Sequence, residues 1–498
     1  MAAPNRVRVY GATIRGVQAV PVDVEVAITS GLPGFAIVGL PDAAVQESRE
    51  RVRCALRALG FTVPQRKVVV NLAPSSLRKT GSGFDLPIAV GLLIATGQID
   101  PRFADAYLFV GELSFEGGVR PVAGLLAYAL CAKELGLSLA CACCENRIVE
   151  IDGLEQFGVR TLSDLRSGQL VPLRPTGSEA KAQNVDFSDV AGNEVAKRAL
   201  QIAAAGNHGV LMVGPPGSGK TMLASRLPTI LPPLSHEDMM ECALIHSVAG
   251  EGIAEILAGR RPFRAPHHSV TNAGLVGGGS PIRPGEISLA HQGVLFLDEI
   301  AEFKPSALQC LRQPMESGRI CVTRADGNVV FPARFMLVAA SNPCPCGYFG
   351  DAEHACSCAS AQVNAYRNRI GGPLLDRISI HIDVRRQPAR DVMQTSRGTS
   401  SAELAEGVLN ARQFASWRRA QGNATEGPLT TAALIEACGL SDSDRQMFED
   451  TAQAAAMSGR AIVRTLSVAR TIADIDERQR VCADDLYEAL AFRLREGK

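Results

Sequence analysis

Residues Gly209–Thr221 read GVLMVGPPGSGKT. A short apolar run leads directly into a glycine-rich turn, and Met222–Leu227 can begin a helix. A strand, a glycine-rich turn and a helix in that order predict a phosphate-binding loop, whose glycines let consecutive backbone N–H groups face the phosphates. A chance glycine-rich turn is the alternative, and the matching context argues against it. The predicted nucleotide-binding residues are Gly214, Pro215, Pro216, Gly217, Ser218, Gly219, Lys220 and Thr221.

Acidic residues after a second apolar strand supply the partners that such a loop needs. We expect Lys220 to contact the β- and γ-phosphates and Thr221 to ligate Mg²⁺. The strand Val294–Leu297 ends in Asp298 and Glu299. The aspartate suits Mg²⁺ and the glutamate suits polarisation of the attacking water, so hydrolysis is expected and not binding alone. An ordinary surface acidic pair is the weaker alternative beside a phosphate loop.

Two further polar residues follow at positions suited to the γ-phosphate. A third apolar strand, Phe335–Ala340, is followed closely by Asn342, which would help to orient the attacking water. Arg377 comes just after a short helical segment. An arginine inserted into a neighbouring subunit's site would stabilise the charge of the transferring phosphoryl group. On sequence alone, an ion pair of Arg377 with Asp376 or Asp383 within the same chain is an equal alternative to this role.

The rest of the chain divides by composition around these motifs. With 498 residues, two to four domains are expected. The first region contains predicted strands at 22–28, 35–38 and 67–72 and predicted helices at 43–59 and 86–96, and the region after residue 401 has a helical period throughout. The predicted domains are an N-terminal domain at 1–170, a linker at 171–187, an α/β core at 188–385 and a helical domain at 402–498.

Charge and hydropathy limit the partners. Lys and Arg total 51, as do Asp and Glu, so any DNA contact must come from a local basic surface. One candidate cluster spans 260–268, and a second, on the helix at 43–59, is equally well explained as a solvated face. Residues 1–20 lack a signal pattern and no stretch suits a bilayer, so we expect a cytoplasmic protein without membrane contact.

Four of the 14 cysteines form two close pairs, Cys344-Pro-Cys346 and Cys356-Ser-Cys358. Four thiolates can supply a tetrahedral Zn²⁺ site, which fits a reducing cytosol better than two disulfides do. His354 could replace one ligand, and reduced, unligated cysteines are the alternative. We predict a structural zinc clip, because four cysteines leave no open position for a catalytic metal. Most other cysteines, including Cys54, are predicted to be small buried apolar residues.

The motifs GPPGSGKT, GVLFLDEI, SNPCPCG and GPLLDRI, in that order, resemble those of the magnesium-chelatase-related AAA+ ATPases, with the bacterial ComM/YifB branch nearest. The resemblance covers nearly the whole chain. It implies a P-loop AAA+ core with a C-terminal helical lid, working as a homo-hexameric ring with ATP and Mg²⁺. It also implies that Asn342 is sensor 1 and Arg377 the arginine finger. Sensor 2 should come from the lid, by spacing Arg460, with Arg464 second.

Two inserted elements are also implied. Glu316–Arg334 is independently predicted to be a β-hairpin with an Asp326-Gly327 turn. Gly274–Pro281 is a glycine-rich loop suited to a mobile pore element. In related motors such hairpins line the central pore and grip DNA, and an ordinary sheet extension is the equal alternative.

The N-terminal region resembles the Lon-protease-like fold, an α+β fold akin to domain 2 of ribosomal protein S5. Residues 79–89 (KTGSGFDLPIA) and 111–125 (GELSFEGGVRPVAGL) carry that likeness. Peptidase activity would need a serine nucleophile and a lysine base. Those motif positions fall on Gly83 and Leu126, so we interpret the region as a binding or assembly module.

The resemblance implies ATP-driven translocation on DNA, specifically branch migration during homologous recombination and natural transformation. One rival is the motor subunit of a magnesium chelatase, which predicts a bare AAA+ core without the N-terminal domain and the cysteine loop. Another is an ATP-driven protease or remodeller of a protein client, and Gly83 and Leu126 argue against the protease. Stimulation of ATP hydrolysis by branched DNA, by porphyrin-binding subunits or by unfolded protein separates these functions.

Overall fold

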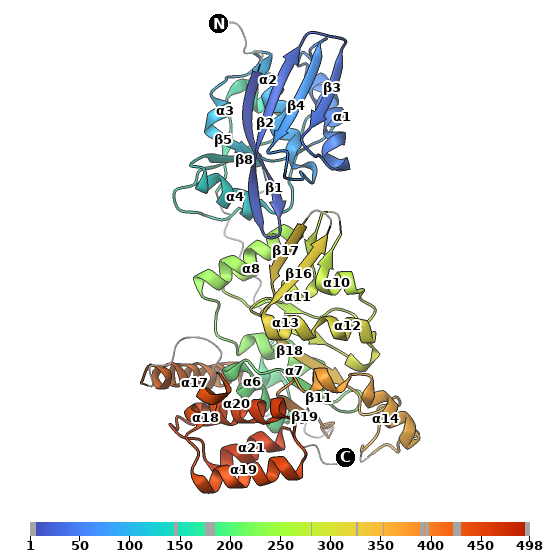
Figure 1. Ribbon diagram of the computed structural model, residues 1–498, viewed down its shortest axis with the longest axis vertical. Coiled ribbons are helices and arrows are strands. Elements are labelled where there is room, and N and C mark those ends of the chain that lie inside the picture. The colour runs from blue at the N-terminus through green and yellow to red at the C-terminus, as the bar shows by residue number, and fades with distance from the viewer. Residues whose placement is uncertain are drawn as a thin grey trace.

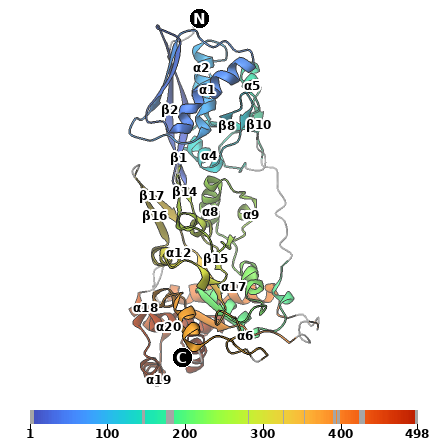
Figure 2. The same ribbon diagram turned by 90° about the vertical axis from the view of Figure 1, so that its right-hand side faces the viewer.

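The computed structural model describes residues 6–143, 148–174, 185–279, 281–324, 327–351, 353–388, 393, 398–421 and 430–493. The chain has a mixed α/β architecture in three parts along its long axis (Figures 1 and 2). An N-terminal sheet lies at one end, a parallel sheet in the middle and a group of helices at the other end. Within the described ranges, no helix has both the length and the apolar character that a membrane crossing requires.

The N-terminal part is built on an eight-stranded mixed sheet with the order β10-β9-β8-β5-β1-β2-β4-β3. Its long β1–β2 hairpin pairs antiparallel over its whole length and alternates buried and exposed side chains over much of it, as a half-buried strand pair should. The strands are β1 (Arg6–Arg15), β2 (Gln18–Thr29), β3 (Gly34–Val38), β4 (Lys67–Ala73), β5 (Tyr107–Phe109), β8 (Ser138–Ala142), β9 (Gln156–Val159) and β10 (Val171–Pro172).

The helices of this part pack against the sheet or flank it. Every residue of α2 (Asp85–Ala95) is buried, because after its first residue, Asp85, the helix is apolar on every side. Gly91 lets it approach β2, since a Cβ there would lie 2.6 Å from Val26 Cγ2. The others are α1 (Ala43–Ala58), α3 (Phe103–Ala106), α4 (Leu125–Glu134) and α5 (Leu162–Ser167), and β6 (Glu112–Leu113) pairs with β7 (Val119–Arg120).

The middle part contains a five-stranded, wholly parallel sheet with the order β12-β15-β18-β11-β19. Because β18 lies between β11 and β15, the residues after these three strands meet at one edge. The strands are β11 (Val210–Val213), β12 (Phe263–Arg264), β15 (Val294–Leu297), β18 (Met336–Ser341) and β19 (Ile380–Asp383). The helices are α6 (Glu194–Gly206), α7 (Lys220–Arg226), α8 (His236–Ala249), α9 (Ala254–Leu257), α10 (Asn272–Val276), α11 (Glu286–Leu289), α12 (Pro305–Cys310), α13 (Arg312–Ser317), α14 (Ser360–Asn368) and α15 (Gly372–Leu375).

Two small hairpins extend from this core. The predicted hairpin forms from β16 (Arg319–Arg324) and β17 (Gly327–Pro332), and residues 325–326 of its turn lie outside the described residues. The prediction of a glycine-rich loop at Gly274–Pro281 was wrong over its first half. Its first residues end α10, and β13 (Gly277–Gly278) pairs with β14 (Arg283–Pro284). A Cβ on Gly277 would lie 2.6 Å from the Arg283 carbonyl oxygen, so this close pairing needs glycine.

The C-terminal part consists of α17 (Ser401–Gln421), α18 (Thr431–Cys438), α19 (Asp442–Ala454), α20 (Gly459–Ile475) and α21 (Ala483–Ala491). Hydroxyl side chains begin three of these helices: Thr430, Ser441 and Ser458 each accept a hydrogen bond from the N–H three residues on. Such a cap stabilises a helix by about 1 kcal/mol. Apolar residues of these helices share one core with α6, β11, β18 and β19.

The N-terminal part contacts the middle part directly. The Gly124 N–H donates to the Ser247 carbonyl at 2.7 Å, and the Leu126 N–H donates to the Ser247 hydroxyl at 3.2 Å. Buried apolar residues of α4, α8 and α9 form a single cluster. Residues 171–172 belong to the N-terminal sheet as β10 and not to a linker, because they pair with β9.

Candidate nucleotide site

The predicted phosphate loop lies between β11 and α7, as the sequence pattern requires. Gly217 and Gly219 have φ angles of +77° and +90°, a region that favours glycine. A Cβ built on either would meet nothing within 4 Å, so the loop faces open space. Gly214 is needed for another reason, because a Cβ there would lie 2.1 Å from the Val384 carbonyl oxygen. The loop therefore forms an open cradle of backbone N–H groups at a helix N-terminus.

Lys220 is buried and lies across the loop. Its ammonium donates to the carbonyl oxygens of Gly214 at 2.7 Å and Pro215 at 2.9 Å, and it lies 3.4 Å from Asn342 Oδ1. Burial lowers the pKa of this ammonium, while the carboxylates of Asp298 and Glu299 oppose that shift. The structure thus brings Lys220 and Asn342 together, although 122 positions separate them in the chain.

The acidic residues lie beside the loop. The Thr221 hydroxyl donates to Asp298 Oδ2 at 2.9 Å, and the Glu299 N–H donates to Asp298 Oδ1 at 3.0 Å. Glu299 has a φ of +50°, unusual for a residue other than glycine, and its side chain is 53% exposed. A carboxylate that stays in contact with water suits a group that must reach a water molecule.

Sequence reasoning did not give a role here to His268 or Arg386. His268 Nδ1 lies 4.0 Å from Glu299 Oε2, and Arg386 donates to the Pro216 carbonyl oxygen at 2.9 Å. The PFRAPHH run at 262–268 was a signal for the histidine. No local pattern indicates the arginine, which follows β19 and reaches the loop only through the sheet order.

The residues of this site fit ATP and Mg²⁺. A hydroxyl and a carboxylate 2.9 Å apart are the oxygen ligands that Mg²⁺ takes beside phosphates. The open cradle and the Lys220 ammonium supply positive potential for the phosphates themselves.

A cavity of about 840 Å³ lies between the middle and C-terminal parts and is lined by Arg377, Arg460 and Arg464. We call it the arginine cavity. Glu316 pairs with Arg377 at 2.6 Å and with Arg460 at 3.5 Å. Burial, with the charge of Arg377 nearby, lowers the pKa of Arg464, whose Nη1 lies 3.5 Å from Ser379 Oγ. Among the described residues that line this cavity, none belongs to the phosphate loop.

The two basic clusters suggested by sequence are largely engaged within the chain. Arg261 donates to the carbonyl oxygens of Pro232 and Gln292, both at 2.6 Å, and Arg264 pairs with Glu251 and Glu286. On α1, Arg51 pairs with Asp85 at 2.6 Å. Glu50 faces both Arg49 and Arg53 on the same helix.

A different basic surface appears where the N-terminal part meets the hairpin. A cavity of about 500 Å³ is lined by three arginines, Arg15, Arg319 and Arg334, and by one carboxylate, that of Glu241. This carboxylate is bonded to His291 at 2.7 Å. Positions from 15 to 334 meet here, so no local sequence pattern could have shown this cavity.

The two positions that would carry peptidase chemistry in the N-terminal part are buried. A Cβ built on Gly83 would lie 3.1 Å from Val110 Cγ2. Leu126 packs in one apolar cluster with residues of α8. Ser82, which is near by in sequence, donates to Glu112 and not to a lysine. The side chains present offer no serine–lysine pair at these two positions.

Comparison with known proteins places this α/β chain among the magnesium-chelatase-related proteins. Three family models match it: "Magnesium chelatase, subunit ChlI" over residues 186–392, "Subunit ChlI of Mg-chelatase" over 24–146 and "Magnesium chelatase, subunit ChlI C-terminal" over 398–493. YifB of Salmonella typhimurium is 40% identical, with 96% of this chain and 95% of the relative covered.

The "Competence protein ComM" of Haemophilus influenzae is also 40% identical, with 97% of each chain covered. The magnesium-chelatase 67 kDa subunit of Chlorobaculum parvum is 29% identical over only 32% of this chain and 23% of its own length. The chain belongs to the ComM/YifB family of magnesium-chelatase-related AAA+ proteins.

Proposed function

We propose that this chain is an ATP-hydrolysing motor that acts on DNA as a homo-hexameric ring, driving branch migration in homologous recombination and natural transformation. The observation that carries the ATPase part is the meeting of Lys220, Thr221, Asp298 and Asn342 at one edge of the parallel sheet. These residues lie in the segments that follow three separate strands, β11, β15 and β18, so a chance glycine-rich turn would not assemble them.

Each of these side chains has a distinct task in hydrolysis. Bound Mg²⁺–ATP supplies the phosphoryl group and the counter-charge to it. Lys220 would hold the β- and γ-phosphates, and Thr221 and Asp298 would ligate the metal. Glu299 would take the proton of the attacking water. Asn342, whose side chain lies 3.4 Å from the Lys220 ammonium, would act at the γ-phosphate as sensor 1.

The arginine cavity supports a ring. Three guanidinium groups, those of Arg377, Arg460 and Arg464, gather around Glu316 and leave an excess of positive charge. The described residues that line this cavity include none from the phosphate loop of the same chain. The γ-phosphate bound to a neighbouring subunit would balance this positive charge. Arg377 would then be the arginine finger, and Arg460 or Arg464 would be sensor 2.

DNA as the substrate is supported by the basic cavity at the hairpin and by the full-length relative named for competence. Three arginines against one carboxylate give the otherwise neutral chain a local site for phosphates. The magnesium-chelatase relative matches only a third of the chain, which favours the DNA motor over the chelatase subunit. The N-terminal part would then be a binding or assembly module, and the C-terminal helices would be the lid.

The test is ATP hydrolysis by the purified chain with and without a four-way DNA junction. Lys220→Ala should abolish both binding and hydrolysis, Glu299→Gln should abolish hydrolysis and keep binding, and Glu302→Gln, three residues along and exposed, should change neither. Stimulation by the junction supports the DNA motor. Hydrolysis that ignores DNA but responds to porphyrin-binding subunits or to unfolded protein would overturn the DNA part and retain the ATPase.

A further inference from the structure

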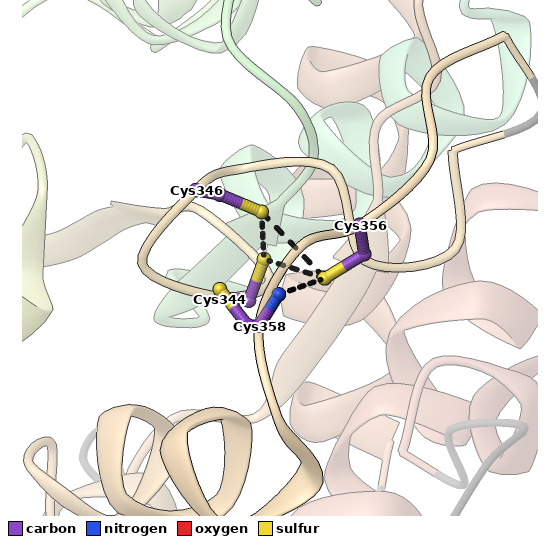
Figure 3. Close-up of side chains that lie close together, drawn as sticks. All are labelled: Cys344, Cys346, Cys356 and Cys358. Atoms are coloured by element: carbon purple, nitrogen blue, oxygen red, sulfur yellow. Dashed lines mark hydrogen bonds between the residues drawn. The ribbon is translucent and has the colours of Figure 1, made fainter.

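Four cysteine side chains meet in the cysteine loop, residues 344–358, which follows β18 and begins two residues after Asn342. Figure 3 shows the sulfur atoms of Cys344, Cys346 and Cys356 facing one another and that of Cys358 beside them, and all four sulfur atoms lie within 4.8 Å of each other. Cys344 is fully buried, while Cys346, Cys356 and Cys358 are partly buried. The loop between the two pairs therefore folds back so that residues 344 and 358 share one centre.

The spacing of these sulfur atoms fits one tetrahedral metal. Cys344 Sγ lies 3.3 Å from Cys346 Sγ and 3.7 Å from Cys356 Sγ, and the latter two lie 3.6 Å apart. Four thiolates at the Zn–S distance of about 2.3 Å form a tetrahedron with edges of about 3.8 Å. A disulfide requires about 2.05 Å. An iron–sulfur cluster would hold the thiolates farther apart, because iron and sulfide atoms must fit between them.

Backbone N–H groups orient the sulfur atoms as they do in metal sites. The Phe349 N–H donates to Cys344 Sγ at 3.3 Å, and the Cys358 N–H donates to Cys356 Sγ at 3.4 Å. His354, which sequence reasoning kept as a substitute ligand, stacks on Tyr348 with ring centroids 4.9 Å apart and faces Asp351. The ligand set is therefore the four cysteines.

This loop also rests on the phosphate loop. Gly347 has a φ of +88°, and a Cβ there would lie 2.7 Å from Pro216 Cδ, so the backbone at Gly347 lies close against the proline ring. Arg386 contacts both loops. It donates to the Pro216 carbonyl oxygen at 2.9 Å and lies 3.9 Å from Glu353 of the cysteine loop. The cysteine loop is thus linked to Pro216 on one side and to Asn342 through the chain on the other.

We propose that Cys344, Cys346, Cys356 and Cys358 bind one structural Zn²⁺, and that this metal holds the cysteine loop against Pro216 and so braces the phosphate loop. The bracing rests on the proposed nucleotide site, and the metal site does not. Four thiolate ligands fill the coordination sphere, so the metal is structural and takes no part in hydrolysis.

The metal is tested first, on the full chain purified without chelators. Metal analysis should find about one zinc per chain, and exchange with Co²⁺ should give the visible absorption of a tetrahedral thiolate site. The double variant Cys356→Ser/Cys358→Ser should lose the metal, whereas Cys54→Ser/Cys321→Ser, at two exposed cysteines, should keep it. A wild-type chain without stoichiometric zinc and without the Co²⁺ absorption would overturn the site, and that result does not depend on the variants folding.

The bracing is tested by binding of a fluorescent ATP analogue to the same proteins. Loss of the metal should weaken nucleotide binding by about ten- to a hundredfold, because a loop that loses its support is misplaced. Unchanged affinity in a folded, zinc-free variant would overturn the bracing. Lys220→Ala should lose nucleotide binding and keep its zinc. A wild type that contains zinc but binds no nucleotide would therefore count against the proposed function and leave the metal site standing.

Discussion

Single glycines decide how close the loops of the nucleotide site can come. Gly347 and Gly350 both have left-handed φ angles, +88° and +78°. Only Gly347 faces a neighbour, because a Cβ on Gly350 would meet nothing within 4 Å. The two positions are therefore matched for backbone strain and differ in their contact with Pro216.

Gly347→Ala should weaken nucleotide binding by about tenfold, equivalent to about 1.4 kcal/mol, because the added methyl displaces Pro216. Gly350→Ala should cost about 1 kcal/mol of stability through backbone strain alone and leave the affinity unchanged. Titration with a fluorescent ATP analogue and denaturant unfolding measure the two effects. Equal affinities for the two variants would show that the contact with Pro216 does not position the loop.

The site residues that the sequence predicted are those that lie in a short continuous motif next to a predicted strand. Lys220 and Thr221 follow a strand directly, and the strand itself predicts where Asp298 lies. Arg386 and Glu316 could not be predicted, since their contacts with Pro216 and with Arg377 each join positions more than 60 residues apart. Cys54 was predicted to be buried and is exposed, because it lies on the solvent side of α1.

Among the elements, the hairpin of β16 and β17 has one buried face and one exposed face. Ile320, Val322, Val329 and Phe331 are buried in the core of the middle part. Arg319, at the base of the hairpin, is exposed and lines the basic cavity beside Arg334. The exposed face is thus available for a phosphate backbone.

Arg319→Ala and Arg334→Ala should reduce stimulation by junction DNA and leave hydrolysis without DNA unchanged. Each arginine that binds a phosphate should, when replaced, lower the slope of log affinity against log salt by about 1. Arg102→Ala, whose side chain is 90% exposed at a distant loop of the N-terminal part, is the control. DNA affinity that is insensitive to both hairpin variants at every salt concentration would remove this cavity from the DNA path.

The contact between β11 and α20 depends on a neutral histidine. His208, just before β11, lies 2.8 Å from Thr471 Oγ1, and burial lowers its pKa from 6.5 to about 3. Between about pH 6.5 and pH 3 the unfolded chain therefore binds one proton more than the folded chain. As the pH falls through this window, His208 therefore lowers the free energy of unfolding by about 1.4 kcal/mol per pH unit.

His208→Gln removes that titration and can keep a hydrogen bond to Thr471. Denaturant unfolding at about pH 7 and about pH 5 should show a loss of stability about 2 kcal/mol smaller in the variant than in the wild type. Carboxylates contribute equally to both proteins, so the difference isolates the histidine. The same pH dependence in both would mean that His208 has the same pKa in the folded and the unfolded chain, so that burial does not lower it.

Elements with a strong period were predicted well, and those set by tertiary contacts were not. The region after residue 401 was predicted to be helical and forms α17 to α21, because hydroxyl caps and apolar periods mark these helices. No strand was predicted at Arg6–Arg15, although buried and exposed residues alternate over the first part of β1. The Gly277–Gly278 strand has no side chains to give a period, so only its pairing with β14 reveals it.

At the scale of the whole molecule, the arginine cavity predicts shared active sites. Arg377→Ala alone should lower the rate of hydrolysis by about 10³-fold or more, as loss of an arginine finger does. Mixing Arg377→Ala with Lys220→Ala should restore part of the activity, because some interfaces then pair an intact loop with an intact arginine. Hydrolysis rates of the mixtures measure this.

Mixing Lys220→Ala with Glu299→Gln is the matched control. Both residues belong to one chain's own site, so no arrangement of subunits rebuilds it, and activity should stay lost. A mixture of Arg377→Ala and Lys220→Ala that is equally inactive would place Arg377 within its own chain's site and argue against the shared arrangement.

The cluster that joins α4 to α8 and α9 has a consequence for modularity. The family models divide the chain near residue 186, yet apolar side chains on both sides of that point form one interior. A chain cut there would leave Cys242, Ala243, Ile253 and Ile256 without the leucines of α4 that cover them. Recombination between relatives should therefore succeed only when the N-terminal sheet and α8 are inherited together, as one unit of exchange.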